Sequence, residues 1–291
     1  LSTYKYRMYK IFDGAFNITN VCNLTCAGCE SFNNFAFKNH YQYKDFAHYY
    51  EKWSTLVDIN IVTIHGGEPF TNPDILNWAK ALKDLWPNAR RHYVSSNGTL
   101  IKNHIETCKQ LLNLGWYIDI SIHDPAFETE IVETIEQVLA GQHYQIVQRG
   151  DQIKYVRSNS RTPLFVYYTT TDFISSARAG VEKGKWKFHR SNAEQSHKVC
   201  VDGLPPCSYF HKGKLYQCHL TGLAQDIIKQ FPIEDHAIDL LNEYQGGDPF
   251  EPLDDFFATL HKPMPQCTLC PQSDKTHCIA PMPTKKPLPL L

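Results

Sequence analysis

The sequence has no excess of charge of either sign. Its 29 lysine and arginine residues are balanced by 30 aspartate and glutamate residues, which leaves a net charge of −1. A nucleic-acid-binding chain normally carries a basic face, so we expect no nucleic-acid partner. The chain also lacks an apolar run of about 18 residues, the length that a membrane-spanning helix needs. Residues 1–10 are polar, aromatic and basic rather than signal-like, and we expect a cytoplasmic protein.

Cysteine is too sparse for a small disulfide scaffold, because ten cysteines are spread over 291 residues. Most of them are grouped at C-x3-C or C-x2-C spacing, which is typical of metal binding in a reducing compartment. Cys108 stands alone in a helical pattern and is expected to be a small buried hydrophobic residue. Three of the others lie near the N-terminus and six follow residue 199. This division predicts two separate metal centres.

Short apolar runs alternate with helical patterns over the first two thirds of the chain. Strands are expected at 14–19, 61–65, 91–96, 116–122, 146–147, 152–156 and 164–168, with a sixth parallel strand at 185–190. Helices are expected at 44–57, 75–85, 102–114 and 128–139. Strands alternating with helices imply a parallel sheet with right-handed crossovers, so the predicted fold class is α/β.

The chain is organised around Cys22, Cys26 and Cys29, which follow the first predicted strand at C-x3-C-x2-C spacing. Three thiolates from one tight loop can face a single point. A structural zinc site needs four ligands, and an iron–sulfur cluster usually has four thiolates. Three local cysteines therefore leave one iron of a four-iron cluster open to an outside ligand. The alternative is a zinc knuckle that takes its fourth ligand from elsewhere.

The spacing of these cysteines resembles the signature of the radical S-adenosylmethionine (radical SAM) enzymes. The resemblance implies a [4Fe–4S] cluster whose open iron is chelated by SAM, and a partial (β/α)6 barrel over residues 1–195. Two polar strand ends and a Gly-Gly-Glu-Pro turn then follow in the order that the family shows. The residues that the resemblance places at SAM are Gly66, Gly67, Glu68, Pro69, Ser96, Asn97 and Ser121.

One position departs from the family pattern. The family usually has an aromatic residue just before the third cysteine, and here that position is Gly28. If an aromatic side chain contacts the adenine of SAM, it is expected to be Phe32, Phe35 or Phe37.

A second set of cysteines follows the predicted barrel. Cys207 and Cys218 stand at the two ends of a predicted hairpin, which brings both thiols to one point. Cys267 and Cys270 follow a predicted helix at 233–244. The arrangement resembles the twitch half of the SPASM auxiliary-cluster domain. It implies one auxiliary iron–sulfur cluster, of the [4Fe–4S] type, held by these four cysteines.

The resemblance places this auxiliary cluster in a small cysteine-rich domain of hairpin and helix over residues 196–291, which ends in a Pro-rich tail. Cys200 and Cys278 are two further thiols, too few for a second all-cysteine cluster. Either could replace one of the four predicted ligands, or serve as a ligand together with His211, His219 or His277. A structural zinc ribbon with four cysteine ligands is the alternative for this region.

The resemblance implies that SAM is cleaved reductively to a 5'-deoxyadenosyl radical, which removes a hydrogen atom from the substrate. An electron donor such as flavodoxin or ferredoxin is implied as a partner. We expect oxidation or epimerisation of a small polar molecule of the sugar, aminocyclitol or nucleoside type. About 13 residues precede the first predicted strand, whereas peptide-modifying members often carry a leader-recognition domain there. Maturation of a ribosomally synthesised peptide is the alternative, and a zinc-stabilised interaction protein is the non-enzyme alternative.

No set of residues stands out as a general base. His123 and Asp124 end the fourth predicted strand, at the carboxyl edge where α/β sheets and barrels hold their active sites. Cys200 and Cys278 are candidates for a thiol that returns a hydrogen atom in an epimerisation. These four residues are the catalytic candidates.

Overall fold

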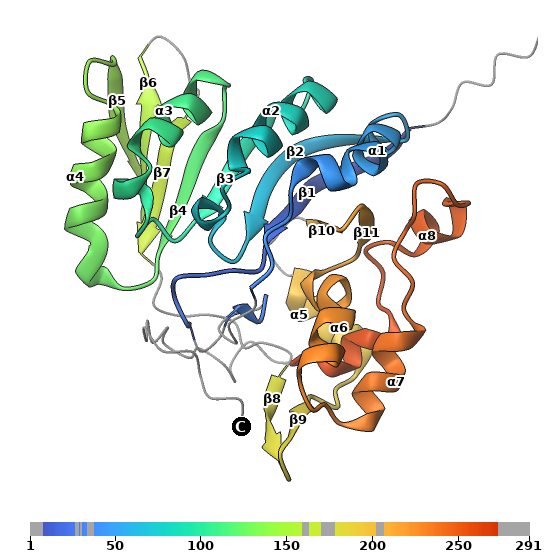
Figure 1. Ribbon diagram of the computed structural model, residues 1–291. Coiled ribbons are helices and arrows are strands. Elements are labelled where there is room, and N and C mark those ends of the chain that lie inside the picture. Colours follow the sequence, from blue (N-terminus) through green and yellow to red (C-terminus); the bar gives the residue numbers. More distant parts are fainter. Residues whose placement is uncertain are drawn as a thin grey trace, which may run out of the picture.

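The computed structural model describes residues 8–26, 29, 31–33, 38–158, 163–169, 178–201 and 207–272. Nine strands form one sheet: β1 (Tyr9–Thr19), β2 (Val57–Gly66), β3 (Arg91–Ser96), β4 (Tyr117–Ile122), β5 (Tyr144–Arg149), β6 (Gln152–Arg157), β7 (Pro163–Thr169), β10 (Cys207–His211) and β11 (Lys214–Tyr216). Their order across the sheet is β11-β10-β1-β2-β3-β4-β7-β6-β5 (Figure 1).

The centre of this sheet is parallel. From β10 through β1, β2, β3 and β4 to β7, every neighbouring pair of strands is parallel. The two edges are antiparallel, since β11 pairs with β10 and the β5–β6 hairpin pairs with β7. Parallel strands bring their carboxyl ends to one edge of the sheet. The α/β class is confirmed, and the largely parallel sheet agrees with a partial barrel.

Four helices connect the parallel strands and cover one face of the sheet (Figure 1). They are α1 (Tyr43–Ser54), α2 (Ile75–Leu85), α3 (Ile105–Asn113) and α4 (Glu128–Val138). Their apolar sides and the facing strand residues form the main core, in which Trp53, Trp78, Val94, Ile120 and Ile135 are fully buried.

Two of the predicted helices differ from the structure at their ends. The helix predicted at 44–57 ends at Ser54, and Val57 instead begins β2, where it pairs with Tyr9. The helix predicted at 102–114 is divided into a 3-10 turn, η3 (Ile101–Asn103), and α3. At Val57, strand pairing overrides the local helical pattern.

The other face of the sheet meets a second, smaller core. The C-terminal lobe around this core contains α5 (Ala193–Val201), α6 (His219–Gln230), α7 (Asp235–Glu243) and the two-stranded sheet β8 (Arg178–Glu182) with β9 (Lys185–Phe188). The helix α8 (Asp254–Thr259) instead packs against the main core through Phe256 and Phe257. The predicted hairpin after Cys207 is confirmed as β10 and β11. The predicted helix at 233–244 is confirmed as α7.

The prediction of a sixth parallel strand at 185–190 was wrong. β9 pairs antiparallel with β8, outside the main sheet. Trp186 and Phe188 are buried in the second core, where Trp186 stacks on Phe231 with ring centroids 4.1 Å apart. The sixth parallel strand is β10, which adds to the free side of β1. Strands from before and after position 195 in the sequence thus belong to one sheet. A domain boundary at residue 195 remains a prediction.

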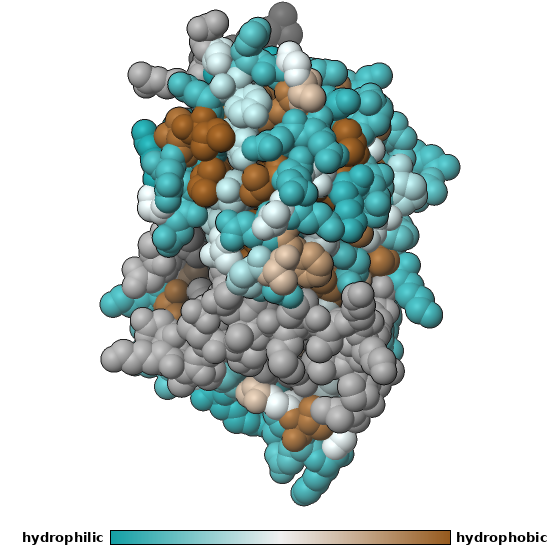
Figure 2. Space-filling view, turned by 90° about the vertical axis from the view of Figure 1, so that its left-hand side faces the viewer, coloured by the Kyte–Doolittle hydropathy of each residue, from teal (hydrophilic) through white to brown (hydrophobic). Residues whose placement is uncertain are grey.

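The surface on the side of α4, β5 and β6 is mostly hydrophilic, with separate hydrophobic spots (Figure 2). Ile146, on the edge strand β5, is one exposed hydrophobic side chain, at 56% relative exposure. Among the helices of the described ranges, none is both long and apolar enough to cross a membrane.

His92, on β3, gives a pH-dependent prediction for stability. Its Nε2 lies 3.0 Å from Trp86 O and its Nδ1 lies 3.2 Å from Lys83 Nζ. Burial, and then Lys83, lower the pKa of His92 to about 4 in the folded protein. The pKa of an unfolded histidine is about 6.5, so between about pH 6.5 and 4 the unfolded state binds more protons than the folded state. The free energy of unfolding therefore decreases as the pH is lowered through this range.

We therefore expect the free energy of unfolding to fall less in His92→Gln than in the wild type when the pH is lowered from 7 to 5. The difference should be about 2 kcal/mol, measured by urea denaturation. His143→Gln, at an exposed histidine, is the control and should keep the wild-type slope. Equal slopes for wild type and His92→Gln would contradict the prediction.

Candidate active site

The three N-terminal cysteines lie in the loop that leaves the carboxyl end of β1. Cys26 is buried, and Cys22 and Cys29 are half-buried. Cys29 N donates to Cys26 O at 3.2 Å, which closes a turn between them. Burial raises the pKa of Cys22, and Glu68, Cys29 and Cys26 raise it further. Burial and then Cys29 raise the pKa of Cys26 to about 12. The thiols thus oppose each other's ionisation, and a bound cation would relieve this effect.

The Gly66-Gly67 turn packs directly on this cysteine loop. Gly67 N donates to Thr19 O, and Glu68 N donates to Val21 O, both at 2.8 Å. A Cβ on Gly67 would lie 2.2 Å from Val21 O, and one on Gly66 would lie 2.3 Å from Thr19 O. No side chain fits at either position, so only backbone groups meet the loop.

Glu68 is fully buried and connects the carboxyl ends of β2 and β3 through hydrogen bonds. Its Oε1 accepts hydrogen bonds from Phe70 N at 3.2 Å and Ser96 Oγ at 2.9 Å. Its Oε2 accepts one from Asn97 N at 2.8 Å. Burial raises the pKa of Glu68 to about 7, against the lowering effect of these three donors. Pro69, also buried, begins the 3-10 turn η2 (Pro69–Thr71).

Two predicted SAM contacts, Ser96 and Asn97, come close to the cysteine loop. The Asn97 amide donates to Asn23 Oδ1 at 3.0 Å and to Cys22 Sγ at 3.9 Å. Ser96 and Asn97 are both buried. The carboxyl end of β3 is therefore joined to the cysteine loop by side-chain contacts, and a role for these residues at SAM remains a prediction.

The three candidate residues at the end of β4 have different contacts in the structure. His123 Nδ1 lies 3.4 Å from Cys26 Sγ, and burial lowers the pKa of His123 to about 4. Ser121 Oγ donates to Tyr168 OH at 2.6 Å. Asp124 Oδ1 instead accepts from Ala126 N and caps the 3-10 turn η4 (Pro125–Phe127). His123 thus contacts the cysteine loop, while Asp124 has a local structural role.

Of the proposed adenine contacts, Phe32 is buried in the second core, and Phe35 and Phe37 lie outside the described residues.

The C-terminal cysteines are only partly described. Cys218 precedes α6 as its N-cap, and Cys267 and Cys270 lie at a 3-10 turn, η5 (Pro265–Leu269). Burial raises the pKa of Cys267, and the electrostatic effect of Cys218 raises it further. Cys200 is exposed on α5. The Cys207 side chain and Cys278 lie outside the described part of the chain.

Within the described ranges, no three His, Cys, Asp or Glu side chains already surround one point as ligands of a metal ion. Both ligand sets therefore remain predictions. The donor chemistry suits an iron–sulfur cluster at the first set, because three neighbouring thiols share one loop at the carboxyl edge of the sheet.

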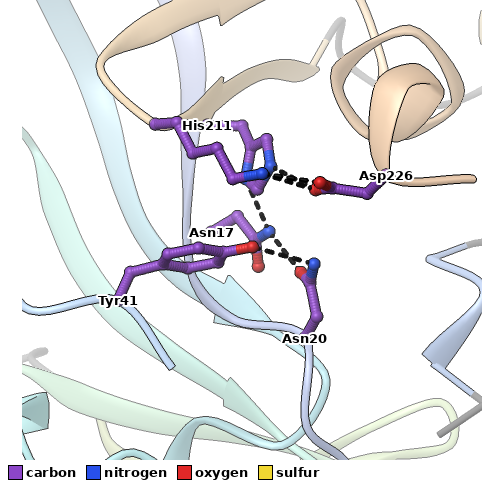
Figure 3. Close-up of polar contacts among 6 residues, drawn as sticks. Asn17, Asn20, Tyr41, His211 and Asp226 are labelled. Carbon is purple, nitrogen blue, oxygen red and sulfur yellow. Dashed lines mark hydrogen bonds and ion pairs between the residues drawn. The ribbon is translucent and has the colours of Figure 1, made fainter. Parts of the chain in front are cut away.

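Sequence reasoning missed a buried polar network beside the cysteine loop (Figure 3). The Asn17 amide donates to Asn20 Oδ1 at 2.7 Å and lies 2.9 Å from His211 Nδ1. His211 Nε2 lies 3.0 Å from Asp226 Oδ2, and Lys212 Nζ donates to both oxygens of Asp226. Burial raises the pKa of Asp226, but hydrogen bonds from His211 and Lys212 outweigh it and bring the pKa to about 2.

This network fixes the tautomer of His211. Asp226 is ionised and accepts, so His211 carries its hydrogen on Nε2 and accepts from Asn17 at Nδ1. Asn20, which also donates to Tyr41 OH at 3.0 Å, lies two residues before Cys22. The network therefore links α6 and β10 to the start of the cysteine loop. The only signal of this network in the sequence is the pair Asn17 and Asn20 at the end of a predicted strand.

We expect Asn17→Asp to lower the free energy of unfolding by about 3 kcal/mol. The new carboxylate would face two acceptors, the lone pair of His211 Nδ1 and Asn20 Oδ1. Urea denaturation measures the change, with Asn88→Asp at an exposed loop position as the matched control. A loss no larger than that of the control would show that Asn17 does not donate to both of these acceptors.

Comparisons with known proteins agree with this geometry. The sequence profile described as "Radical SAM superfamily" matches residues 16–150. A search of the curated proteins gives no match. The solved structure of BtrN in complex with AdoMet and 2-DOIA is similar over 94% of this chain and 100% of that chain, at 16% identity and a TM-score of 0.51. At this identity the likeness concerns the fold.

SuiB of Streptococcus suis bound to S-adenosylmethionine is similar over 88% of this chain and 66% of that chain, at 13% identity and a TM-score of 0.40. The matched residues 16–150 contain the cysteine loop, the Gly66-Gly67 turn and the ends of β3 and β4. Residues 16–150 therefore form a domain of the radical SAM superfamily.

Proposed function

We propose that this radical SAM enzyme oxidises or epimerises a small polar molecule. The observation that carries the proposal is the packing of the Gly66-Gly67 turn on the loop that carries Cys22, Cys26 and Cys29. A [4Fe–4S] cluster with SAM supplies reductive cleavage of SAM to a 5'-deoxyadenosyl radical, which removes a hydrogen atom from the substrate.

The protein's own residues would hold and orient these groups. The three thiols would be the ligands of the cluster, and the glycine turn, which packs on the cysteine loop, would present its backbone groups to SAM. Ser96, Asn97 and Ser121 are the proposed polar contacts to SAM. BtrN, which has a similar fold, was solved with AdoMet and 2-DOIA, and this supports a SAM site together with a second ligand.

The inner face of the sheet supports a polar substrate. Alternate residues of the parallel strands place Asp13, Thr63, Tyr93 and Asp119 on the face opposite to α1–α4. Thr63 Oγ1 donates to Asp13 Oδ1 at 2.9 Å. Burial raises the pKa of Asp13 and of Asp119 to about 6. A face built only for packing would be apolar, so these polar groups favour contact with a polar ligand.

We further propose an auxiliary [4Fe–4S] cluster held by Cys207, Cys218, Cys267 and Cys270. The packing of Cys218 and Cys270 against the same second core supports it. Such a cluster would accept the electron that the substrate releases in an oxidation, while an external donor such as flavodoxin or ferredoxin reduces the first cluster.

Iron and sulfide content after anaerobic reconstitution tests the two-cluster proposal. We expect about eight irons per chain in the wild type and about four in a Cys22/Cys26/Cys29→Ala variant. A Cys218/Cys267/Cys270→Ala variant should also retain about four, because each variant loses one cluster. Cys108→Ala, at a buried cysteine of α3, is the control and should keep the wild-type content. About four irons in the wild type, with none left in the first variant, would refute the auxiliary cluster alone.

A further inference from the structure

The cysteine loop runs across the carboxyl edge of the sheet, from the end of β1 toward the end of β4. Glu68 N, just after β2, donates to the backbone at the start of the loop. Farther along, the Asn23 amide donates to Thr99 Oγ1 at 2.7 Å, beyond the end of β3. Cys26 then meets His123, the residue that follows β4, with 3.4 Å between Cys26 Sγ and His123 Nδ1. This last contact connects the loop to β4.

Two of the predicted cluster ligands have a nitrogen atom close to their sulfur. Leu24 N donates to Cys22 Sγ at 3.5 Å, within the loop itself. At Cys26 the nitrogen comes from another element, because His123 lies about 100 residues later in the chain. His123 is half-buried, so water competes for the contact less than it would at the surface.

The hydrogen in the contact between Cys26 and His123 is assigned by chemistry once a metal is bound. A cysteine that ligates a metal does so as a thiolate, which carries no hydrogen and can only accept. The contact is then favourable only when His123 carries a hydrogen on Nδ1. His123 would thus donate a charge-assisted N–H···S hydrogen bond to the Cys26 thiolate.

We propose that His123 is a positioning residue that donates from Nδ1 to the Cys26 thiolate and thereby raises the reduction potential of the cluster held by Cys22, Cys26 and Cys29. Hydrogen bonds to the sulfur atoms are among the factors that set the potential of an iron–sulfur cluster. The inference rests on the proposed function, because it takes these three cysteines as cluster ligands.

The direction of the effect follows from charge. One electron from the reductant makes the cluster and its thiolates more negative by one charge, and no proton is transferred in this step. An N–H group that points at a thiolate stabilises the more negative state more strongly. The hydrogen bond from His123 therefore favours reduction. This role accounts for a histidine that the sequence indicates only as a catalytic candidate.

The reduction potential of the first cluster tests the inference. The reconstituted wild type and each variant are titrated anaerobically with dithionite, and the EPR signal of the reduced cluster is followed. The signal that changes when SAM is added identifies the first cluster, because SAM would bind its open iron. Iron content shows which variants keep this cluster.

His123→Phe keeps a ring and removes both nitrogen atoms. At equal solution potential, we expect the ratio of reduced to oxidised first cluster to fall about tenfold. For a one-electron couple, this fall corresponds to a midpoint potential lowered by about 59 mV. His123→Leu also lacks a donor and should show the same fall.

His123→Asn is the matched variant that keeps a donor. Its amide nitrogen is bonded to Cγ, as Nδ1 is in histidine, so it can donate to Cys26 Sγ from nearly the same position. The ratio of reduced to oxidised cluster should therefore stay within about threefold of the wild type. His236→Phe, at an exposed position on α7, is the control and should match the wild type.

Equal midpoint potentials for the wild type and His123→Phe, in a protein that cleaves SAM, would overturn the inference. The same result in His123→Asn as in His123→Phe, whether a fall in the ratio or a loss of iron, would also overturn it. Loss of the first cluster from the Phe and Leu variants alone would support it, because the hydrogen bond would then hold the ligand loop. A wild-type protein that neither binds iron nor cleaves SAM would instead overturn the proposed function.

Discussion

Gly67→Ala should abolish most of the SAM cleavage activity, lowering 5'-deoxyadenosine formation by at least about 100-fold. The new Cβ would lie 2.2 Å from Val21 O and 2.5 Å from Val21 C, both backbone atoms that cannot rotate away. The turn and the cysteine loop must therefore move apart. That movement breaks the 2.8 Å hydrogen bonds from Gly67 N to Thr19 O and from Glu68 N to Val21 O.

The matched control for this variant is Gly180→Ala. Gly180 lies in β8, and a Cβ there would meet no atom within 4 Å. This substitution should leave both activity and stability near wild type. The assay is anaerobic 5'-deoxyadenosine formation with dithionite as reductant, at equal iron content. Gly67→Ala with activity like that of Gly180→Ala would mean that the glycine turn does not need its close approach to the loop.

The second large effect is expected at Glu68. Glu68→Leu leaves three buried donors without an acceptor, namely Phe70 N, Ser96 Oγ and Asn97 N. Each unpaired donor costs about 1–3 kcal/mol, so we expect the three together to lower the free energy of unfolding by roughly 3–9 kcal/mol. Glu68→Gln keeps one oxygen and should lose about 1–3 kcal/mol, because its amide hydrogens face at least one donor.

Urea denaturation of the reconstituted proteins measures this series. Glu133→Gln, at an exposed position on α4, is the control and should be neutral within about 0.5 kcal/mol. The order wild type, Glu68→Gln, Glu68→Leu is the expected result. Similar losses for Gln and Leu would show that the carboxylate does not accept all three hydrogen bonds.

The sequence was most informative where chemistry depends on local spacing. The cysteine triplet, the strand before it and the Gly66-Gly67 turn are each contained within a few residues, and local patterns predict such features. The alternation of strands and helices likewise predicted the parallel part of the sheet, which has the order β1-β2-β3-β4-β7. The role of Glu68 was less visible, because its donors come partly from the next strand, about 30 residues later.

Features that depend on distant pairing were not predictable in this way. His211 and Asn17 are 194 residues apart and meet only because β10 adds to the free edge of β1. The apolar pattern of β9 predicted a strand, yet its place was decided by the fit of Trp186 against Phe231. Local pattern gives the type of an element, whereas packing decides which neighbour it finds.

The loop of Cys22, Cys26 and Cys29 should support cleavage of SAM, and every other proposed role depends on that reaction. Anaerobic formation of 5'-deoxyadenosine from SAM by the reconstituted, dithionite-reduced protein, followed by mass spectrometry, tests it directly. We expect the wild type to form this product and the Cys22/Cys26/Cys29→Ala variant to form none above background. A wild-type protein that contains zinc in place of iron and leaves SAM intact would contradict this assignment.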